Sequence, residues 1–356
     1  MLLPGVTAQQ VRTRRLTVNV LGTEAADGVP VVFVHGNVSS ALFWQQQMLA
    51  LPGRYRPLAV DLRGFGQSGV QPVDATRGLR DFADDVLGAL DGLQVEAAHL
   101  VGWSMGGGVV LRMLLERPES VRSVTLVAPV SPYGFGGTTG PGGAMISADG
   151  APSGAGGANP EFVSLLAAGD TSTDSQASPR NVFRAFYVAP GFHDEHEDMY
   201  VASMLTTHTG THNYPGDMRP SDAWPGAAPG TSGVLNTMAP TVCDLTGIVD
   251  VVPKPLILWL RGDQDQIVGD QSMFDLATLG KLGVVPGWPG PETHAPQPML
   301  AQTRFVLDRY VAAGGRYREV VLPGVGHSPH IEAPIEFATE LHATLDAAEG
   351  AVPSAS

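Results

Sequence analysis

Cysteine and basic residues are scarce in this sequence, and each scarcity excludes a class of protein. The 356 residues include one cysteine, Cys243, so neither an internal disulfide framework nor a cysteine-rich zinc site is expected. Lysine and arginine number 21 against 35 aspartates and glutamates, which gives a net charge of −14. Such a surface repels nucleic acids and anionic membranes, so we expect neither as a partner.

Long apolar runs are also missing. No stretch approaches about 18 consecutive apolar residues, so the sequence predicts no transmembrane helix. Residues 1–15 lack an apolar stretch long enough for a secretory signal, and their charges follow the few apolar residues instead of preceding them. We therefore expect a cytoplasmic protein without a membrane partner, and we leave a homodimer open.

Glycine and proline, by contrast, are abundant. Their 44 and 29 residues make up about 20% of the chain, where about 12% is usual. The excess is local, because 31 of these 73 residues lie in the segments 131–160, 215–240 and 283–298. The composition therefore predicts loop-rich material concentrated in three places and an ordinary globular composition elsewhere.

Outside these segments, short apolar runs alternate with helical patterns. The runs, such as VPVVFV at 29–34 and VRSVTLV at 121–127, suit strands that are buried on both faces of a parallel sheet. Between them, residues 79–93 carry apolar side chains at helical spacing. This order predicts an α/β fold with a mostly parallel sheet and helices on both faces. The other predicted strands are 56–60, 97–101, 255–260 and 318–322, and the other predicted helices are 109–115 and 304–311.

The alternation stops after residue 130 and resumes at about residue 251. We therefore predict one core domain that is interrupted by an inserted segment, a name kept below for residues 131–250. The core domain then comprises residues 1–130 and 251–346. Small and polar residues from 347 to 356 predict a frayed tail.

One short motif has the setting of a nucleophilic serine. Gly102-Trp103-Ser104-Met105-Gly106 matches G-x-S-x-G and lies directly between a predicted strand and a helical pattern. A strand–turn–helix of this kind holds the serine in a strained turn at the carboxyl end of the sheet. The alternative is a glycine-rich turn that only packs a helix on a strand, and the context favours the nucleophile.

A serine nucleophile needs a base and an acid that orients the base. His327 is the candidate base, because it follows the last predicted strand in a glycine-containing loop. The acid should also follow a strand, and both Asp263 and Asp265 follow the run PLILWL. We favour Asp265, at the apex of its loop, and expect Asp263 to hold the turn through backbone hydrogen bonds.

An oxyanion hole needs two backbone N–H groups aimed at the developing charge. Met105, the residue after the serine, is one candidate, and Asn37, in the turn after the first predicted strand, is the other. The side-chain amide of Asn37 is a further candidate donor. For the loop at 61–68 we expect a structural role.

The other histidines favour structural interpretations. His99 lies inside a predicted strand, His35 belongs to a turn, and His330 is placed to pack beneath His327. The run HDEHED at 193–198 has spacings that suit a metal, but a solvated acidic helix face explains it more simply. We expect no metal and no cofactor.

Together these segments resemble the α/β-hydrolase superfamily, in the group with a lid after the sixth strand. The chain order Ser, Asp, His is typical of that fold, so the resemblance implies an α/β-hydrolase fold with an inserted lid. HGNVSSALFW is similar to a loop of haloalkane dehalogenases and epoxide hydrolases, which use an aspartate nucleophile where this chain has Ser104. This departure points to acyl transfer to water. The matching signatures are HGN at 35–37, DLRGFGQS at 61–68, GWSMGG at 102–107, RGDQD at 261–265 and GVGHSPHIEAP at 324–334.

The spacing between acid and base departs from the family pattern. The 62 residues from Asp265 to His327 exceed the spacing common in the superfamily. We expect the proline-rich loop at 284–298 to be the surplus and to border the mouth of the active site.

We therefore predict a serine hydrolase that cleaves a small carboxylic ester or lactone through an acyl-enzyme. A carbon–carbon bond hydrolase of a diketone would use the same triad, and a non-catalytic receptor of the same fold would retain it. Apolar residues of the inserted segment, together with Trp103, are candidates for the substrate pocket, although they would equally pack the segment onto the core. These residues are Phe162, Leu165, Phe183, Phe186, Tyr187, Met204 and Trp224.

Overall fold

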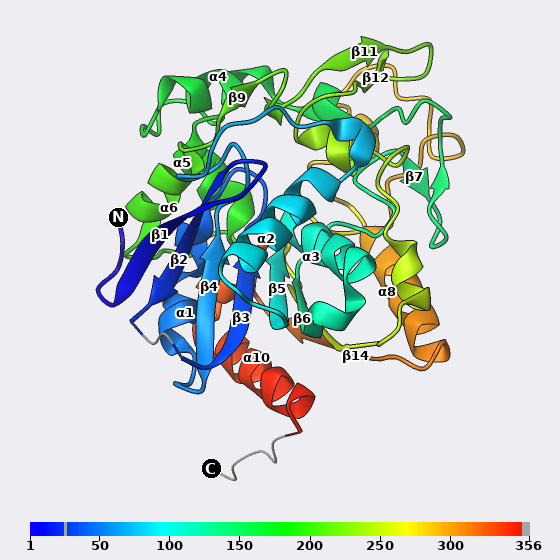
Figure 1. Ribbon diagram of the computed structural model, residues 1–356. Coiled ribbons are helices and arrows are strands. Elements are labelled where there is room, and N and C mark those ends of the chain that lie inside the picture. The colour runs from blue at the N-terminus through cyan, green and yellow to red at the C-terminus, as the bar shows by residue number, and fades with distance from the viewer. Residues whose placement is uncertain (25–26, 351–356) are drawn as a thin grey trace.

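An eight-stranded sheet in the order β1-β2-β4-β3-β5-β6-β13-β14 forms the centre of the computed structural model, which describes residues 1–24 and 27–350 (Figure 1). β2 pairs antiparallel with both β1 and β4, and the other neighbouring strands are parallel. The mostly parallel sheet that the sequence predicts is therefore confirmed. The strands are β1 (Val6–Arg12), β2 (Thr17–Thr23), β3 (Val29–Val34), β4 (Tyr55–Val60), β5 (Ala98–Trp103), β6 (Val121–Val127), β13 (Leu256–Gly262) and β14 (Arg316–Leu322).

The six strands predicted from the sequence are present, whereas β1 and β2 are not among the predictions. β1 lies at the edge of the sheet and exposes most of its side chains, so it has no apolar run. β2 buries the polar Asn19, whose side-chain amide donates to Asp61 Oδ2 over 2.8 Å. A strand whose polar residue is satisfied by a distant carboxylate gives no regular signal in the sequence.

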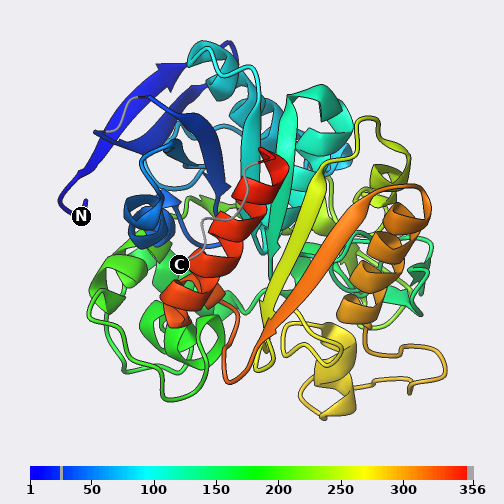
Figure 2. The ribbon, with the colours of Figure 1, turned by 90° about the horizontal axis from the view of Figure 1, so that it is seen from below.

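Helices cover both faces of the sheet. α2 and α3 pack on one face (Figure 1), and α10 crosses the other face beside α1 (Figure 2). In α2, Phe82, Val86 and Leu90 are buried because their spacing places them on one side of the helix. α8 packs against the edge strand β14. These helices are α1 (Gln45–Ala50), α2 (Arg80–Gly92), α3 (Met105–Glu116), α8 (Met299–Ala312) and α10 (Pro334–Ala348).

The C-terminal end differs from the prediction at its first residues. The predicted tail begins at residue 347, whereas α10 continues to Ala348 because Leu341 and Leu345 anchor its last turns in the core. Residues 351–356 of that tail lie outside the described residues. Among residues 1–24 and 27–350, no helix combines the length and the apolar character needed to cross a bilayer.

The inserted segment leaves the sheet after β6 and returns before β13. Its helices lie together (green in Figure 1), and a π-helical turn at Phe183–Tyr187 directly follows α5. The glycine- and proline-rich ends of the segment form short strands and 3₁₀ turns. The helices are α4 (Pro160–Ala168), α5 (Pro179–Val182) and α6 (Glu197–Met204), and the strands are β7 (Thr138–Thr139), β8 (Ala144–Met145), β9 (Thr209–Gly210), β10 (Tyr214–Pro215), β11 (Met218–Pro220) and β12 (Ala227–Pro229).

Candidate active site

Ser104 lies at the turn between β5 and α3, at the carboxyl end of a central strand. Its backbone has φ 57° and ψ −121°, a conformation that residues other than glycine rarely adopt. Ser104 N donates to Val127 O of β6 (2.9 Å), and Ser104 O accepts from Gly107 N (2.9 Å) and Val130 N (3.1 Å). These bonds hold the serine in a strained turn at the N-terminus of α3.

Glycines around this turn are required because backbone segments approach one another closely. A Cβ atom on Gly102 would lie 2.3 Å from Gly106 O, and one on Gly106 would lie 2.4 Å from Val34 O in β3. In the turn after β3, a Cβ atom on Gly36 would lie 2.9 Å from Ser104 Cβ. Glycine at these positions therefore lets both α3 and the turn after β3 reach the serine.

His327 and Asp265 follow β14 and β13, respectively, and meet at this edge of the sheet. His327 Nδ1 lies 2.9 Å from Asp265 Oδ2, and the two side chains are only 2% and 4% exposed. The other carboxylate oxygen, Oδ1, accepts from Ile267 N (2.8 Å) and Val268 N (2.9 Å). The loop thus orients the carboxylate, and the carboxylate orients the imidazole with its Nε2 atom directed away from Asp265.

Asp263 has a different environment, although it belongs to the same loop. Its side chain is exposed, and its Oδ1 accepts from Gly324 N (2.7 Å) in the turn that precedes His327. The structure therefore brings Asp265 to the histidine and gives Asp263 the kind of turn-holding contact that the sequence suggests.

Ser104 and His327 line the same small cavity of about 80 Å³, together with Met105 and Asn37. The indole Nε1 of Trp103 donates to His327 O over 2.8 Å and holds the histidine loop against the serine turn. Within the described part of the chain, no hydrogen bond joins the Ser104 hydroxyl to the imidazole. Such catalytic bonds are often long without substrate and shorten in the substrate complex.

The two predicted oxyanion donors also border the small cavity. Met105 is the first residue of α3, so its N–H has no partner one turn earlier in the helix and lies at the positive end of the helix dipole. Tyr187 OH donates to Asn37 O (2.9 Å) and thereby orients the peptide that follows Asn37. The side-chain Oδ1 of Asn37 is buried and has no hydrogen-bond partner among residues 1–24 and 27–350. Both residues therefore line the same cavity as Ser104.

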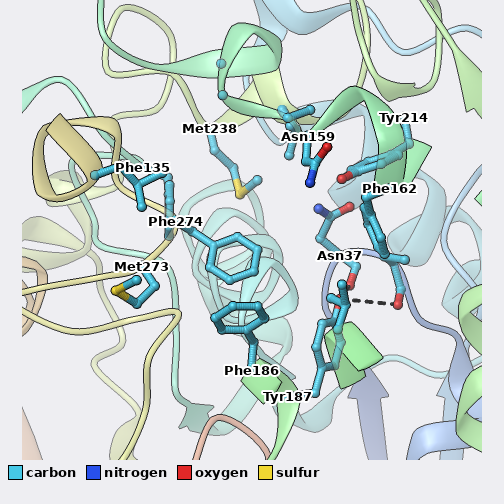
Figure 3. Close-up of a pocket in the computed structure, with 17 residues that line it drawn as sticks. Asn37, Phe135, Asn159, Phe162, Phe186, Tyr187, Tyr214, Met238, Met273 and Phe274 are labelled. Atoms are coloured by element: carbon cyan, nitrogen blue, oxygen red, sulfur yellow. Dashed lines mark hydrogen bonds between the residues drawn. The ribbon is translucent and has the colours of Figure 1, made fainter. Parts of the chain in front are cut away.

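A larger cavity of about 280 Å³ adjoins the small one (Figure 3). The rings of Phe186 and Phe274 meet edge to face inside it, with ring centroids 5.1 Å apart and ring planes at 88°. Among its described lining residues there is no lysine, arginine, aspartate or glutamate. The two cavities share the lining residues Asn37, Phe135, Tyr187, Leu235, Met238 and Phe274.

Part of the predicted substrate pocket coincides with this larger cavity. Phe162, Phe186 and Tyr187, all from the inserted segment, line it. Leu165 and Trp224 do not belong to the lining of either cavity. The inserted segment therefore supplies walls of the site, but through fewer of its aromatic and aliphatic residues than the sequence suggests.

Three predicted pocket residues are corrected by the structure. Trp103, Phe183 and Met204 line neither cavity, because they are buried in the core with exposed fractions of 0%, 1% and 0%. Phe183 stacks on Tyr200 with ring centroids 5.6 Å apart, and Trp103 stacks on Phe43 at 5.2 Å. An apolar residue in the sequence does not reveal whether it will form a wall or fill the interior.

Several cavity walls are missing from the sequence predictions. They come from the irregular ends of the inserted segment and from the stretch between Asp265 and His327, where no regular pattern points inward. The short helix α7 (Leu276–Lys281) supplies one of them. The missed aromatic, leucine and methionine residues are Phe135, Tyr214, Leu235, Met238, Met273, Phe274 and Leu279.

The proline-rich loop at 284–298 has another position than the predicted one. None of its residues lines either cavity. Instead, Gln297 near its end accepts from Gly136 N (2.6 Å) through Oε1 and donates to Gly134 O (3.1 Å) through Nε2. The loop therefore fastens the first part of the inserted segment from outside the cavities.

Three other histidines are buried in the packing of the core domain. Burial lowers the pKa of His35, and it lowers the pKa of His99 to about 4. His330 packs on Trp44 with ring centroids 4.3 Å apart, and burial, followed by repulsion from His327, lowers its pKa well below the usual value. Neutral imidazoles in these places support the structural interpretation of the sequence.

The acidic run at 193–198 takes part in ion pairs. Glu197 lies 2.6 Å from an Arg180 nitrogen and 2.8 Å from an Arg184 nitrogen, so it joins α6 to the preceding helical turns. Across residues 1–24 and 27–350, no group of three or more histidine, cysteine, aspartate or glutamate side chains could hold a metal ion. The run thus has a structural use within the inserted segment.

The mostly parallel sheet and the serine at the turn between β5 and α3 are features of the α/β-hydrolase fold. The comparison with family models agrees with this assignment. The model of the alpha/beta hydrolase family matches residues 31–340. The chain therefore belongs to this family.

Curated relatives match a shorter part of the chain. An uncharacterised carboxylesterase of Bacillus subtilis is 30% identical over 124 residues, which are 35% of this chain and 41% of that protein. A 2-hydroxymuconate semialdehyde hydrolase of Pseudomonas sp. is 35% identical over 107 residues, which are 29% of this chain and 38% of that protein. The aligned parts thus span less than half of either relative.

Solved structures match almost the whole chain at low identity. A carboxylesterase of Bacillus subtilis superposes with a TM-score of 0.57 and 15% identity, over 96% of this chain and 91% of that one. A 2-hydroxy-6-oxo-6-phenylhexa-2,4-dienoate hydrolase of Rhodococcus sp. has a TM-score of 0.58 and 17% identity, over 95% and 98%. At these identities the likeness shows a shared fold.

Proposed function

We propose that the protein is a serine hydrolase that cleaves a neutral carboxylic ester or lactone. The observation that carries this proposal is the shared cavity of Ser104 and His327, in which the histidine is held by Asp265 over 2.9 Å. A strained serine, a buried imidazole and an oriented carboxylate are the parts that acyl transfer requires. The carboxylesterase relatives in Bacillus subtilis agree with this chemistry.

In the proposed reaction, Ser104 Oγ attacks the substrate carbonyl while His327 Nε2 takes the hydroxyl proton. Asp265 accepts the Nδ1–H bond and stabilises the imidazolium. The Met105 and Asn37 N–H groups stabilise the negative oxygen of the tetrahedral intermediate. The imidazolium then protonates the departing alkoxide, and water, deprotonated by His327, releases the acid from the serine.

The uncharged lining favours a neutral substrate. Of the described residues around both cavities, His327 is the only one with a side chain that can carry a charge at neutral pH. A carboxylate buried there without a cationic partner would cost several kcal/mol. The relatives named as hydrolases of a semialdehyde and a dienoate provide the alternative, carbon–carbon bond cleavage, but an anionic dienoate would find no lysine or arginine among the described residues of these walls.

The cavity dimensions limit the size of the substrate. An engineered cavity of roughly 150 Å³ holds one benzene ring, and the larger cavity here has about 280 Å³. We therefore propose an acyl or alcohol group of the size of one aromatic ring or a short alkyl chain, seated between the apolar walls that include Phe186 and Phe274.

Turnover of p-nitrophenyl butyrate tests the proposed activity. We expect Ser104→Ala to lower kcat by roughly 10³-fold or more, whereas the control Ser120→Ala, on the 3₁₀ turn before β6, keeps the wild-type rate. We also expect p-nitrophenyl butyrate to exceed the anionic p-nitrophenyl hemisuccinate in kcat/KM by about 100-fold, because of the carboxylate burial cost. Equal rates for both esters, or faster cleavage of a diketone than of any ester, would contradict the proposal.

A further inference from the structure

Glu332 holds both sides of the histidine loop through one carboxylate. It is the last residue of α9 (Pro329–Glu332), which begins two residues after His327. Its Oε2 accepts from Gly326 N (2.9 Å), and its Oε1 accepts from Ser328 N (3.1 Å). These two amides flank His327, so the carboxylate fixes the peptide groups on either side of the proposed base.

The same carboxylate also binds the inserted segment. Glu332 Oε2 accepts from Ala189 N over 2.6 Å. Ala189 follows Tyr187, which lines both cavities and donates to Asn37 O. A Cβ atom on Gly326 would lie 2.6 Å from Ala189 N, so the histidine loop and the inserted segment are already in backbone contact. One half-buried acceptor therefore joins the histidine loop, the turn after β3 and the cavity wall.

Glu332 acts on His327 through its charge as well as through its hydrogen bonds. Burial raises the pKa of Glu332, while the three backbone N–H groups and then His327 lower it. The contact from the inserted segment is a backbone amide, and the titratable group that interacts with this carboxylate is His327. A carboxylate in this position stabilises a protonated imidazole, which the proposed mechanism forms when the serine gives up its proton.

We infer that Glu332 is a positioning residue that aligns His327 and ties this alignment to the 187–189 stretch of the inserted segment. The inference rests on the proposed function, because it assigns His327 the role of base. If the 187–189 stretch moves away, Ala189 N leaves the shared carboxylate and the histidine loop loses its tie to the cavity wall. The full set of three N–H donors on the carboxylate therefore depends on the 187–189 stretch staying in place.

Replacement of Glu332 by glutamine tests this inference. The amide keeps the shape of the side chain but removes the charge and one accepting oxygen, so at least one of the three N–H bonds is lost. We expect kcat for p-nitrophenyl butyrate to fall by about tenfold or more, as misplacement of a catalytic group does. We also expect the acidic limb of the pH profile, where kcat/KM falls as the pH decreases, to move to lower pH, because the imidazolium loses a stabilising charge.

The matched control is Glu336→Gln, the same chemical change on an exposed residue in the first turn of α10. It should leave kcat within about twofold of wild type and the acidic limb in place. Glu332→Asp retains the charge with a shorter reach, so we expect a lowered kcat and an unmoved limb. If Glu332→Gln fails to fold, as shown by circular dichroism, Glu332→Asp carries the test, and an unchanged kcat in that variant would overturn the inference.

Two outcomes would overturn the inference. An unchanged kcat in Glu332→Gln would show that His327 does not depend on the hydrogen bonds of Glu332. A lowered kcat with an unmoved acidic limb in Glu332→Gln would show that Glu332 has only a structural role. Nuclear magnetic resonance of the His327 ring protons against pH gives a readout that needs no turnover. If the wild type cleaves no ester, the proposed function fails, while the ring-proton titration still tests whether Glu332 acts on the imidazole.

Discussion

The small and the large cavity share several walls, yet they are built from different parts of the chain. The small cavity holds Ser104, Met105, Asn37 and His327, which all follow strands of the sheet. The large cavity is walled mainly by the irregular ends of the inserted segment and by the stretch around α7. The difference teaches that the sheet positions Ser104 and His327, whereas irregular segments of the chain form most of the walls of the large cavity.

The largest expected effect distinguishes the two aspartates of the loop after β13. Asp265→Asn replaces the carboxylate that binds His327 by an amide that favours the wrong imidazole tautomer, so we expect kcat to fall by roughly 10³-fold or more. Asp263→Asn, which alters only the contact with Gly324 N, should leave kcat within about threefold. Steady-state kinetics on p-nitrophenyl butyrate measures both. A larger loss in Asp263→Asn than in Asp265→Asn would reverse the assignment.

A smaller effect distinguishes a residue that lines the large cavity from a residue that is buried in the hydrophobic core. Phe186 and Phe183 lie in the same π-helical turn, but Phe186 lines the large cavity and Phe183 is 1% exposed in the core. We expect Phe186→Ala to change the preference between butyrate and benzoate esters by about tenfold with little loss of stability. Phe183→Ala should instead cost roughly 3–5 kcal/mol of unfolding free energy and leave the preference unchanged.

Substrate profiles and urea unfolding of the two variants separate these effects. Equal changes of preference in both variants would show that the large cavity is not where the substrate binds.

The third prediction contrasts a buried histidine of the sheet with an exposed one. His99 in β5 has a pKa lowered to about 4 by burial, so the unfolded chain binds more protons than the native protein between about pH 6.5 and 4. Stability should therefore fall as pH decreases through this window, by roughly 3 kcal/mol in total. His99→Gln should flatten that slope in urea unfolding, while the exposed His212→Gln should keep it. An unaltered slope in His99→Gln would assign the acid sensitivity to other groups.

The sequence predicts the sheet and the convergence of Ser104, Asp265 and His327 because their signals are local. Ser104 lies in a strand–turn–helix motif, and Asp265 and His327 each follow an apolar run, so their convergence follows from the parallel sheet. Val6–Arg12 escapes prediction because an exposed edge strand needs no apolar pattern.

The walls of the large cavity could not be predicted in the same way. Phe135, Met238 and Phe274 lie in irregular segments, and their positions depend on tertiary contacts such as those of Gln297 with the inserted segment. The bond from Ala189 N to Glu332 is likewise invisible in the sequence, because 143 residues separate its partners. Irregular chain segments have no periodicity that would show which side chains face a cavity.

Covalent labelling with a fluorophosphonate, followed by peptide mapping, tests the central claim most directly, because the probe reacts only with an activated serine. We predict one label per folded wild-type chain, located on Ser104, and no label on Ser104→Ala or on heat-unfolded protein. Labelling of another residue, or undiminished labelling of Ser104→Ala, would contradict the account.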